Sequence, residues 1–381
     1  MAVFSFLSTY PPTRCGLATF TESLAAAVTA PGHDSARIVR VVDDLDAGSP
    51  SVVGSRTIIA GELRVDDPDS LVSAARTLNS ADVAIVQHEY GIYGADDGAA
   101  VIDLLRSLTV PSIVVLHTVL AAPTDQQRIV LQQVAAAAGS VVVMTEAARE
   151  LLAAHYDVDM RHVSVIAHGV DTWHESRITP RSDRITMLSW GLIGPGKGLE
   201  WGIRALALLG DVTPPVHYEI LGETHPKVVA HEGEAYRERL IALAAELGVA
   251  DRVHFVNHYL DRVGIAAHIA AADLVLLPYD SRTQITSGVL VESLAAETHV
   301  IATAFPHAVE LLSGSDGGAI VAHESPDEIA RAVREFAARP APVHEAHDHA
   351  PDTSWPAIAE RYRLLAGATR ESAGAAPART A

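Results

Sequence analysis

The chain has 381 residues, more than one hydrophobic core usually fills, so its length predicts two domains. Hydrophobic residues make up 49% of the sequence and charged residues 20%, which excludes an intrinsically disordered chain. The net charge of -19 excludes a general nucleic-acid binder, because such a protein needs a basic surface to neutralise phosphates.

The sequence predicts a cytoplasmic protein. Cys15 is its single cysteine and cannot form an internal disulfide, which fits a reducing compartment. The apolar start of the chain lacks a basic n-region and stops at Pro11 and Pro12, so we expect no signal peptide. No apolar run reaches the roughly 20 residues that span a bilayer. Peripheral contact with a membrane and the oligomeric state stay open.

The first half of the chain alternates strands and helices. Apolar runs predict strands at residues 2–7, 37–42, 52–60, 83–87, 111–116, 141–144 and 163–166. Helical spacing predicts helices at residues 19–28, 71–78, 101–108 and 125–138, with another helix starting at 145–146. Strands that alternate with helices form a doubly wound parallel sheet, so we expect a Rossmann-like α/β domain over residues 1–178.

The turn after the first strand contains Cys15 and Gly16. Gly16 lets the backbone pass tightly, and ligands of parallel sheets bind at this end of the strands. Any strand-to-helix unit needs some turn here, so the structural and the functional interpretation of Gly16 stand about even.

Polar side chains also follow two later strands. His88, Glu89 and Tyr90 come directly after the strand at 83–87, and His117 follows the next strand. We expect the triplet to face a site, because burying such side chains inside the sheet is costly. Two histidines at the ends of neighbouring strands favour a site further, although a lone histidine is more often structural.

The second half repeats the alternation after a polar, proline-bearing segment at residues 173–184. Strands are predicted at residues 187–190, 216–221, 253–256 and 274–277, and helices at 199–209, 235–247 and 265–271. We therefore expect a second Rossmann-like domain over residues 179–354, which faces the first domain across a ligand-binding cleft.

A glycine-rich turn with one lysine connects the first strand of this domain to its helix. Gly191, Gly194 and Gly196 let backbone N–H groups approach an anion, and Lys197 adds a positive charge near the helix N-terminus. Among 28 basic residues the chain has lysine only at Lys197 and Lys227. The turn predicts a phosphate site; the alternative is a structural turn with a solvated lysine.

A second helix start follows the strand at 274–277. Ser287 and Gly288 fit the beginning of a helix, and Gly288 again permits close approach of the backbone to a ligand. If Val289 packs inward, Glu292 points along the cleft with its oxygens free to bind sugar hydroxyls. Taken alone, the pattern favours a helix-dipole or surface role for Glu292.

The C-terminal segment predicts an amphipathic helix over residues 355–368 and a disordered tail over residues 369–381. Before the helix, His344, His347 and His349 lie in a proline-flanked stretch. They could bind a metal, but the chain has 19 histidines to distribute, so we expect no metal site.

Three stretches taken in order resemble one family. They are HGVD at the end of the first half, GLIGPGKGLEWGIRAL at the start of the second, and SGVLVESLAAETHVIATAFPHAVELL further on. Together they resemble the family 4 glycosyltransferases, retaining enzymes of the GT-B architecture whose last helix crosses back to the N-terminal domain. The likeness runs from Met1 to about Leu365, and its motifs are specific as an ordered set.

The resemblance implies that a nucleotide-diphosphate sugar is held mainly by the C-terminal domain. It implies that Lys197 contacts the diphosphate, that Glu292 binds the ribose and that His117 lies beside the donor sugar. The family carries a glycine pair near the diphosphate, and here Gly16 matches one glycine while Cys15 replaces the other.

Two further positions depart from the family pattern. Leu192 stands where the family has an arginine on the diphosphate. Gln284 stands where the family has the first of two glutamates, so a neutral amide would face the sugar hydroxyls. These departures bear on activity, donor identity and sugar orientation.

The expected function is a metal-independent, retaining transfer of a mannosyl or glucosyl group from GDP-mannose or UDP-glucose. The acceptor is a hydroxyl group of a glycan, a lipid-linked molecule or a small molecule, bound on the side of His88, Glu89 and Tyr90. No cofactor is implied besides the donor substrate. Two alternatives stay open: a protein that binds a nucleotide sugar without turnover, and a nucleotide-sugar epimerase or hydrolase on the same scaffold.

Overall fold

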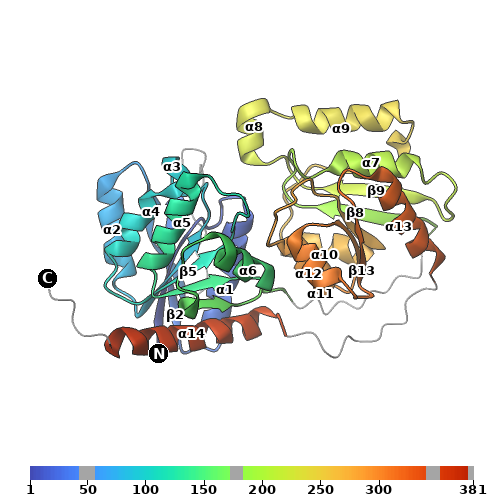
Figure 1. Cartoon of the computed structure of the whole chain (residues 1–381). Helices are drawn as coiled ribbons and strands as arrows, with labels where there is room; N and C mark the ends of the chain where they lie inside the picture. Colours follow the sequence, from blue (N-terminus) through green and yellow to red (C-terminus); the bar gives the residue numbers. More distant parts are fainter. Residues whose placement is uncertain (43–55, 172–182, 340–351, 376–381) are drawn as a thin grey trace. The chain divides into compact units, whose positions relative to one another are not determined.

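The computed structural model describes residues 1–42, 56–171, 183–339 and 352–375 (Figure 1). The chain divides into two compact units: unit 1 joins Met1–Gly169 to Asp352–Ala381, and unit 2 is Val170–Pro351. The division falls earlier than the expected boundary at residues 178–179, which itself lies outside the described residues. Each unit is described by itself, and the cleft expected between them stays a prediction.

Unit 1 is built on a parallel sheet of seven strands in the order β3-β2-β1-β4-β5-β6-β7. The strands are β1 (Val3–Ser8), β2 (Ser35–Val42), β3 (Thr57–Arg64), β4 (Val83–His88), β5 (Ser112–Leu116), β6 (Ser140–Val143) and β7 (Val163–Val165). Strands β4, β5 and β6 are buried throughout, because helices cover both faces of a doubly wound sheet. The edge strand β3 is only partly buried and overlaps the predicted strand at 52–60, whose residues 52–55 lie outside the described residues.

The helices of unit 1 are α1 (Gly16–Thr29), α2 (Pro68–Leu78), α3 (Ala95–Gly98), α4 (Ala100–Arg106), α5 (Asp125–Ala137), α6 (Glu146–His155) and α14 (Trp355–Ala375). Side-chain caps fix where several of them begin: Asp67 caps α2, Thr124 caps α5 and Thr145 caps α6. Phe20 of α1 and Tyr362 of α14 share one hydrophobic core with strands β1 and β5.

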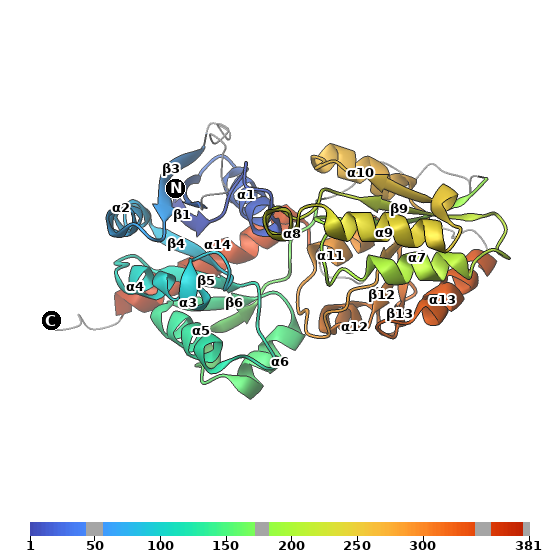
Figure 2. The same ribbon diagram turned by 90° about the horizontal axis from the view of Figure 1, so that it is seen from above.

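Helix α14 joins the end of the chain to the first unit (Figure 2). It packs along α1, and Arg363 donates to the carbonyl oxygens of Ala27 and Val28 at 3.0 and 2.7 Å. The hydroxyls of Thr369 and Ser140 lie 2.8 Å apart. Since the helix continues to Ala375, the prediction of a disordered tail is wrong for residues 369–375.

Unit 2 is a second parallel sheet, with six strands in the order β10-β9-β8-β11-β12-β13. The strands are β8 (Ile185–Trp190), β9 (Val216–Leu221), β10 (Val253–Val256), β11 (Leu274–Leu277), β12 (His299–Thr303) and β13 (Gly318–Val321). The helices are α7 (Leu199–Ala207), α8 (Pro226–Glu232), α9 (Ala235–Glu246), α10 (Arg262–Ala271), α11 (Gly288–Ala295), α12 (Pro306–Leu312) and α13 (Pro326–Ala338). Figure 1 shows α7, α9 and α13 on one face of this sheet and α10, α11 and α12 on the other, each face with its own core.

The two sheets share one topological feature that positions the functional loops. In unit 1 the chain winds outward from β1 to β3 and then starts again at β4 on the other side of β1. In unit 2 it winds from β8 to β10 and starts again at β11 beside β8. Ligands of open α/β sheets bind at such switch points, outside the carboxyl ends of the strands. The fold confirms two Rossmann-like domains and directs attention to the loops after β1, β4, β8 and β11.

Candidate functional site

The glycine-rich loop of unit 2 runs from the end of β8 to the start of α7. Gly191, Gly196 and Gly198 have φ values of 116°, 86° and 62°, a region that favours glycine. A Cβ on Gly198 would lie 1.9 Å from the carbonyl oxygen of Pro278, so only glycine lets the loop pass the end of β11. A Cβ on Gly196 would meet no atom within 4 Å. The backbone at Gly196 is therefore open to a ligand.

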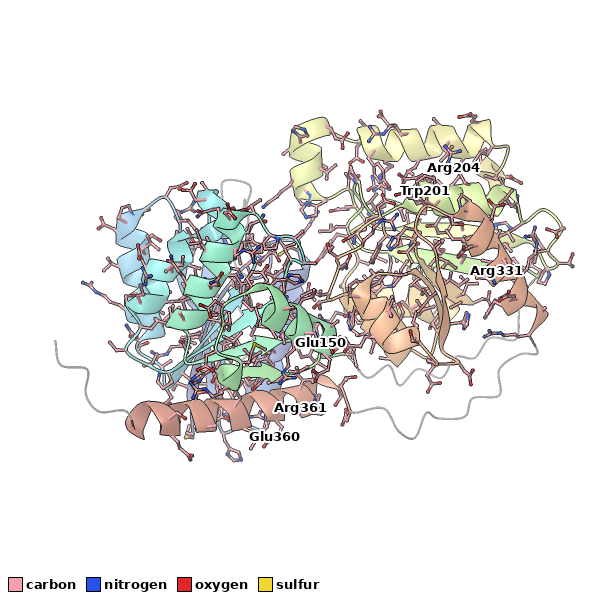
Figure 3. The ribbon with its side chains drawn as sticks, in the orientation of Figure 1. Glu150, Trp201, Arg204, Arg331, Glu360 and Arg361 are labelled. Carbon is pink, nitrogen blue, oxygen red and sulfur yellow. The ribbon has the colours of Figure 1, made fainter. Side chains whose placement is uncertain are left out.

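Lys197 stands on this loop with its ammonium group above an aromatic ring. Its Nζ lies 4.6 Å from the ring centroid of Tyr279, within the range of cation–π attraction. The backbone N–H of Asp280 donates to the carbonyl oxygen of Gly196 at 3.0 Å. The indole of Trp201, labelled on α7 in Figure 3, donates to the Asp280 carboxylate at 2.8 Å. These contacts fix the loop and its lysine against the segment that follows β11.

The loop before α11 is held by a histidine that the sequence analysis did not single out. The backbone N–H of Ser287 donates to Nδ1 of His307 at 2.9 Å, and the His307 side chain is buried. The Ser287 hydroxyl caps α11 by accepting from the N–H of Leu290 at 3.2 Å. The Gln284 amide donates to the carbonyl oxygen of Thr286 at 3.1 Å, which folds this side chain over its own loop.

The first turn of α11 reaches the glycine-rich loop. Gly288 begins the helix, as predicted. A Cβ built on Gly191 would lie 3.8 Å from a methyl carbon of Val289, so the two loops are in van der Waals range. A hollow lined by residues 189–193, Lys197 and Tyr279 opens beside them. Unit 2 thus brings the two predicted stretches together at its switch point.

Glu292 follows one turn further along α11 and has a perturbed carboxyl group. Its pKa is raised to about 7, mainly by burial and further by the nearby carboxylate of Asp171, against the lowering effect of Arg262. Arg262 itself pairs with Asp171 at 3.4 Å. The carboxylate of Glu292 has no hydrogen-bond partner within the described residues. It is therefore available to accept hydrogen bonds from a ligand, with a charge that depends on pH near neutrality.

Four buried polar side-chain atoms at this edge of the sheet lack hydrogen-bond partners among the described residues. They are Nε1 of Trp190, the hydroxyl of Tyr279, Oγ1 of Thr286 and Nε2 of His323. Each of these residues lies at or just after the carboxyl end of a strand, or just before α11. Leaving a buried polar group without a hydrogen bond costs about 1–3 kcal/mol. Such an edge fits a surface that a polar ligand completes. The sequence signal for Trp190 and Tyr279 was their place at the end of an apolar run.

In unit 1 the loop after β1 leads into the N-terminus of α1. Gly16 is the first residue of the helix, is exposed, and would meet no atom within 4 Å if it carried a Cβ. Cys15 occupies the N-cap position without a side-chain cap, and its Sγ lies 3.1 Å from the hydroxyl of Thr9. The packing of unit 1 therefore does not require a glycine at position 16. The first N–H groups of α1 have no side-chain cap at this end of the helix.

The predicted triplet after β4 differs in exposure from the expectation. His88 is the last residue of β4 and is 0% exposed, and Tyr90 is buried as well. Burial lowers the pKa of His88 to about 4, so the ring is neutral, and both ring nitrogens lack partners in the described part of the chain. Glu89 is partly exposed and accepts a hydrogen bond from Thr118. His88 and Tyr90 are therefore buried despite the cost that the sequence argument invoked, and the expectation that the triplet faces a site stays a prediction.

His117 lies directly after β5 and is partly exposed. Its Nε2 donates to Oε1 of Gln87 at 2.7 Å, and its ring packs edge-on against Phe20 with centroids 5.0 Å apart. Burial lowers the pKa of His117 to about 3, with smaller contributions from His168 and His88. The imidazole is therefore neutral, with its proton on Nε2 and a lone pair on Nδ1. It suits hydrogen bonding to neutral hydroxyls.

Among the described residues no cluster of histidine, cysteine and carboxylate side chains has the geometry of a metal site. His344, His347 and His349 lie outside the described residues. Of the predicted catalytic residues, Lys197 and Glu292 belong to unit 2 and His117 to unit 1. The described part of the chain also contains no helix that is long and apolar enough to cross a membrane.

Comparison with known families assigns both halves of the chain. Residues 15–174 match the family described as Glycosyltransferase Family 4, and residues 184–339 match the family described as Glycosyl transferases group 1. The chain belongs to the family 4-like glycosyltransferases. The two matches cover the loops after β4, β8 and β11 and the start of α1, so most of the loops described above lie within the matched regions.

Solved structures agree with the GT-B fold of this glycosyltransferase. The complex of Anabaena HepE with UDP and glucose superposes with a TM-score of 0.67 at 16% identity, covering 99% of this chain and 100% of that chain. Sucrose-phosphate synthase from Thermosynechococcus elongatus gives a TM-score of 0.66 at 17% identity, covering 98% and 96% of the two chains. At such identities the likeness establishes the fold alone.

Curated relatives of the glycosyltransferase carry one name. D-inositol 3-phosphate glycosyltransferase of Mycolicibacterium gilvum is 31% identical over 56% of this chain and 48% of its own length. The enzyme of that name from Corynebacterium glutamicum is 27% identical over 69% of this chain and 68% of its own length. The chain spans about half the length of the first of these relatives.

Proposed function

We propose that the protein transfers a hexosyl group, glucosyl or mannosyl, from a nucleotide-diphosphate sugar to an acceptor hydroxyl with retention of the anomeric configuration. The observation that carries the proposal is the loop of Gly191, Gly194 and Gly196. At the switch point of unit 2 it holds Lys197 over the ring of Tyr279 and brings Gly191 within van der Waals range of Val289 on α11. Anion-binding backbone groups, a fixed cation and a carboxylate within one loop system suit a sugar nucleotide.

The donor lies mainly on unit 2. Its diphosphate contacts Lys197 and the backbone N–H groups of the glycine-rich loop and of Gly288. Its ribose hydroxyls donate to Glu292, whose carboxylate has no partner within the described residues. The sugar hydroxyls meet Gln284, which can both donate and accept. UDP-glucose and GDP-mannose are the candidate donors, and the solved HepE complex with UDP-glucose supports the first.

The acceptor lies mainly on unit 1. Gly16 at the open N-terminus of α1 allows the donor diphosphate to approach, and the neutral His117 lies beside the transferred sugar. Glu89 is the accessible member of the predicted acceptor triplet, while the buried rings of His88 and Tyr90 pack edge-on beside it. The named relatives act on D-inositol 3-phosphate, so a polyol is one acceptor class alongside glycans and lipid-linked molecules. Location in the cytoplasm stays a prediction.

In the transfer, the bond between the anomeric carbon and the β-phosphate oxygen breaks and a bond to the acceptor oxygen forms on the same face. The acceptor proton passes to the departing diphosphate. Negative charge grows on that diphosphate as the bond breaks, and Lys197 with the aligned N–H groups is fixed where it grows. Such preorganised groups stabilise the transition state more than the ground state, by roughly 2–4 kcal/mol for each strong donor. In this account lysine and backbone dipoles, rather than a metal ion, neutralise the phosphates.

Calorimetric titration with GDP, UDP and ADP, followed by the matching sugar nucleotides without added metal, tests the donor assignment. We expect micromolar binding of one nucleotide and a loss of roughly 1.5–3 kcal/mol of its binding free energy in Lys197→Ala. An unchanged dissociation constant in this variant would remove Lys197 from the site. Arg331→Ala, exposed on α13 and labelled in Figure 3, is the control.

An acceptor screen with the nucleotide sugar that binds then separates the transferase from its alternatives. Formation of a glycoside that keeps the anomeric configuration supports transfer. Binding of the sugar nucleotide without product for any acceptor supports a binding protein. Release of free sugar, or appearance of an epimeric nucleotide sugar, without any acceptor supports a hydrolase or epimerase.

A further inference from the structure

Leu192 leaves the donor site with a charge deficit. The family places an arginine at this position, and here an aliphatic side chain lines the hollow beside Lys197. A nucleoside diphosphate carries at least two negative charges, whereas the glycine-rich loop offers one lysine. Removing a phosphate charge from water is unfavourable unless cations or N–H groups compensate it. A second cationic group elsewhere on unit 2 would repair the deficit.

The loop between β9 and α8 is joined to the glycine-rich loop through backbone hydrogen bonds. The N–H of Ile193 donates to the carbonyl oxygen of Glu223 at 2.8 Å, and the N–H of His225 donates to the carbonyl oxygen of Ile193 at 2.8 Å. A Cβ on Gly194 would lie 3.1 Å from a methyl carbon of Val228 and 4.0 Å from Cβ of His225. The two loops are therefore hydrogen-bonded to each other, and the residues near His225 lie beside the glycine-rich loop.

This joined structure gathers the two lysines of the chain. His225 lies within the electrostatic reach of both: burial lowers its pKa, and the charges of Lys227 and then Lys197 lower it further. The Nδ1 atom of His225 accepts the backbone N–H of Lys227 at 3.2 Å. In the neutral ring the proton is then on Nε2, which makes His225 a hydrogen-bond donor within the electrostatic reach of both lysines. In a sequence that otherwise uses arginine, both lysines occur at one place.

We propose that Lys227 is the second phosphate-neutralising cation of the donor site, in place of the arginine absent at Leu192, with His225 as a neutral donor beside it. The proposal rests on the proposed function, since it concerns the diphosphate of the same donor. Lys227 lies in the first turn of α8, between His225 and Val228, the two residues that border Gly194 of the glycine-rich loop. In this proposal, Lys227 supplies the positive charge that the family carries at the position of Leu192.

Calorimetry with a nucleoside diphosphate and its parent nucleoside tests this assignment. The pair is UDP and uridine, or GDP and guanosine, whichever base the wild-type protein binds. Lys227→Met keeps the length of the side chain and removes the charge, and we expect it to weaken diphosphate binding about tenfold. Nucleoside affinity should stay unchanged, because the nucleoside has no phosphate. Arg204→Met, an exposed cation on α7 labelled in Figure 3, is the matched control and should change neither affinity.

A rescue variant completes the test. Adding Leu192→Arg to Lys227→Met returns the charge to the family position, and we expect it to recover most of the diphosphate affinity. If Lys227→Met binds the diphosphate as tightly as the wild type while Lys197→Met binds it weakly, the assignment of Lys227 is overturned and the donor site stands. If Lys227→Met weakens diphosphate and nucleoside binding equally, Lys227 supports the loop structurally and the assignment again fails. If the wild-type protein binds no diphosphate, the proposed function fails and this inference falls with it.

Discussion

The backbone N–H of Ser287 donates to Nδ1 of the buried His307 at 2.9 Å, and this hydrogen bond ties the start of α11 to α12. The backbone N–H of His307 in turn approaches the carbonyl oxygen of Gln284 at 3.4 Å. One residue, His307, therefore holds both ends of the loop that carries Gln284 and Ser287, through its ring at one end and its backbone N–H at the other. For Nδ1 to accept a hydrogen bond, the ring must be neutral with its proton on Nε2.

Replacing this histidine should disturb donor binding without touching the donor. We expect His307→Ala to raise the KM for the sugar nucleotide about fivefold, because a buried hydrogen bond of about 1 kcal/mol that positions the loop is lost. His307→Asn places an amide oxygen near the position of Nδ1 and should restore most of the affinity. His231→Ala, exposed on α8, is the control. A purely structural role would instead lower the unfolding temperature of both His307 variants while the KM of the folded protein stayed constant.

Local sequence signals predicted the framework because they depend on neighbours in the chain. The strands at 216–221, 253–256 and 274–277 have the predicted bounds, since an apolar run bounded by polar residues reports burial directly. The glycine-rich turn could also be predicted from the sequence, because positive φ angles favour glycine whatever the tertiary structure. The family resemblance added the roles of single residues.

The remaining features depend on partners far away in the chain. His307 interacts with Ser287 twenty positions earlier, and no periodicity links them. His88 is fully buried, with its ring edge-on against Tyr90, which polarity alone could not predict. Strands β12 and β13 and helices α12 and α13 were not predicted individually. Their stretch entered the prediction mainly through family resemblance.

The raised pKa of Glu292 predicts a pH-dependent donor affinity. The carboxyl group has a pKa of about 7, because it is buried and faces Asp171, with Arg262 as the opposing charge. Only the ionised form offers both oxygens as acceptors to ribose hydroxyls. We expect the KM for the sugar nucleotide to fall as the pH rises from about 6 to 8. Glu292→Gln should bind the donor more weakly at high pH and lose this dependence. A dependence that survives in Glu292→Gln would show that another group titrates.

The buried histidine of β4 predicts loss of stability in mild acid. His88 has its pKa lowered from 6.5 to about 4 by burial, so the unfolded chain takes up a proton at a higher pH than the folded chain. The contribution of the neutral His88 to the free energy of unfolding is therefore complete above pH 6.5. It is lost as the pH falls towards 4, by at most about 3 kcal/mol. Urea unfolding followed between about pH 7.5 and 4.5 should show a falling midpoint. His88→Leu keeps the site apolar and should make that fall smaller, while His117, whose pKa is also lowered by burial, still contributes to it. Equal pH dependence in both proteins would place the acid sensitivity elsewhere.

Substitutions at two glycines of the glycine-rich loop should affect stability and ligand binding to different degrees. Gly198 has a φ of 62° and lies where a Cβ would be 1.9 Å from the carbonyl oxygen of Pro278, so Gly198→Ala meets both backbone strain and a clash. We expect it to destabilise unit 2 by more than about 2 kcal/mol, measured as a lower unfolding midpoint. Gly196 has a φ of 86° and open space around it, so Gly196→Ala should cost only the strain of about 1–2 kcal/mol.

Gly196→Ala, the less destabilising of the two substitutions, should have the larger effect on ligand binding. At Gly196 the open side is where the diphosphate approaches the backbone, and a methyl group there keeps the phosphate oxygens away from the N–H groups. We expect folded Gly196→Ala to bind the nucleoside diphosphate at least tenfold more weakly, by about 1.4 kcal/mol or more, while the parent nucleoside binds as before. If Gly196→Ala keeps its diphosphate affinity, the open space at Gly196 is a solvent-facing turn, and the phosphate must lie nearer to Gly191 and α11.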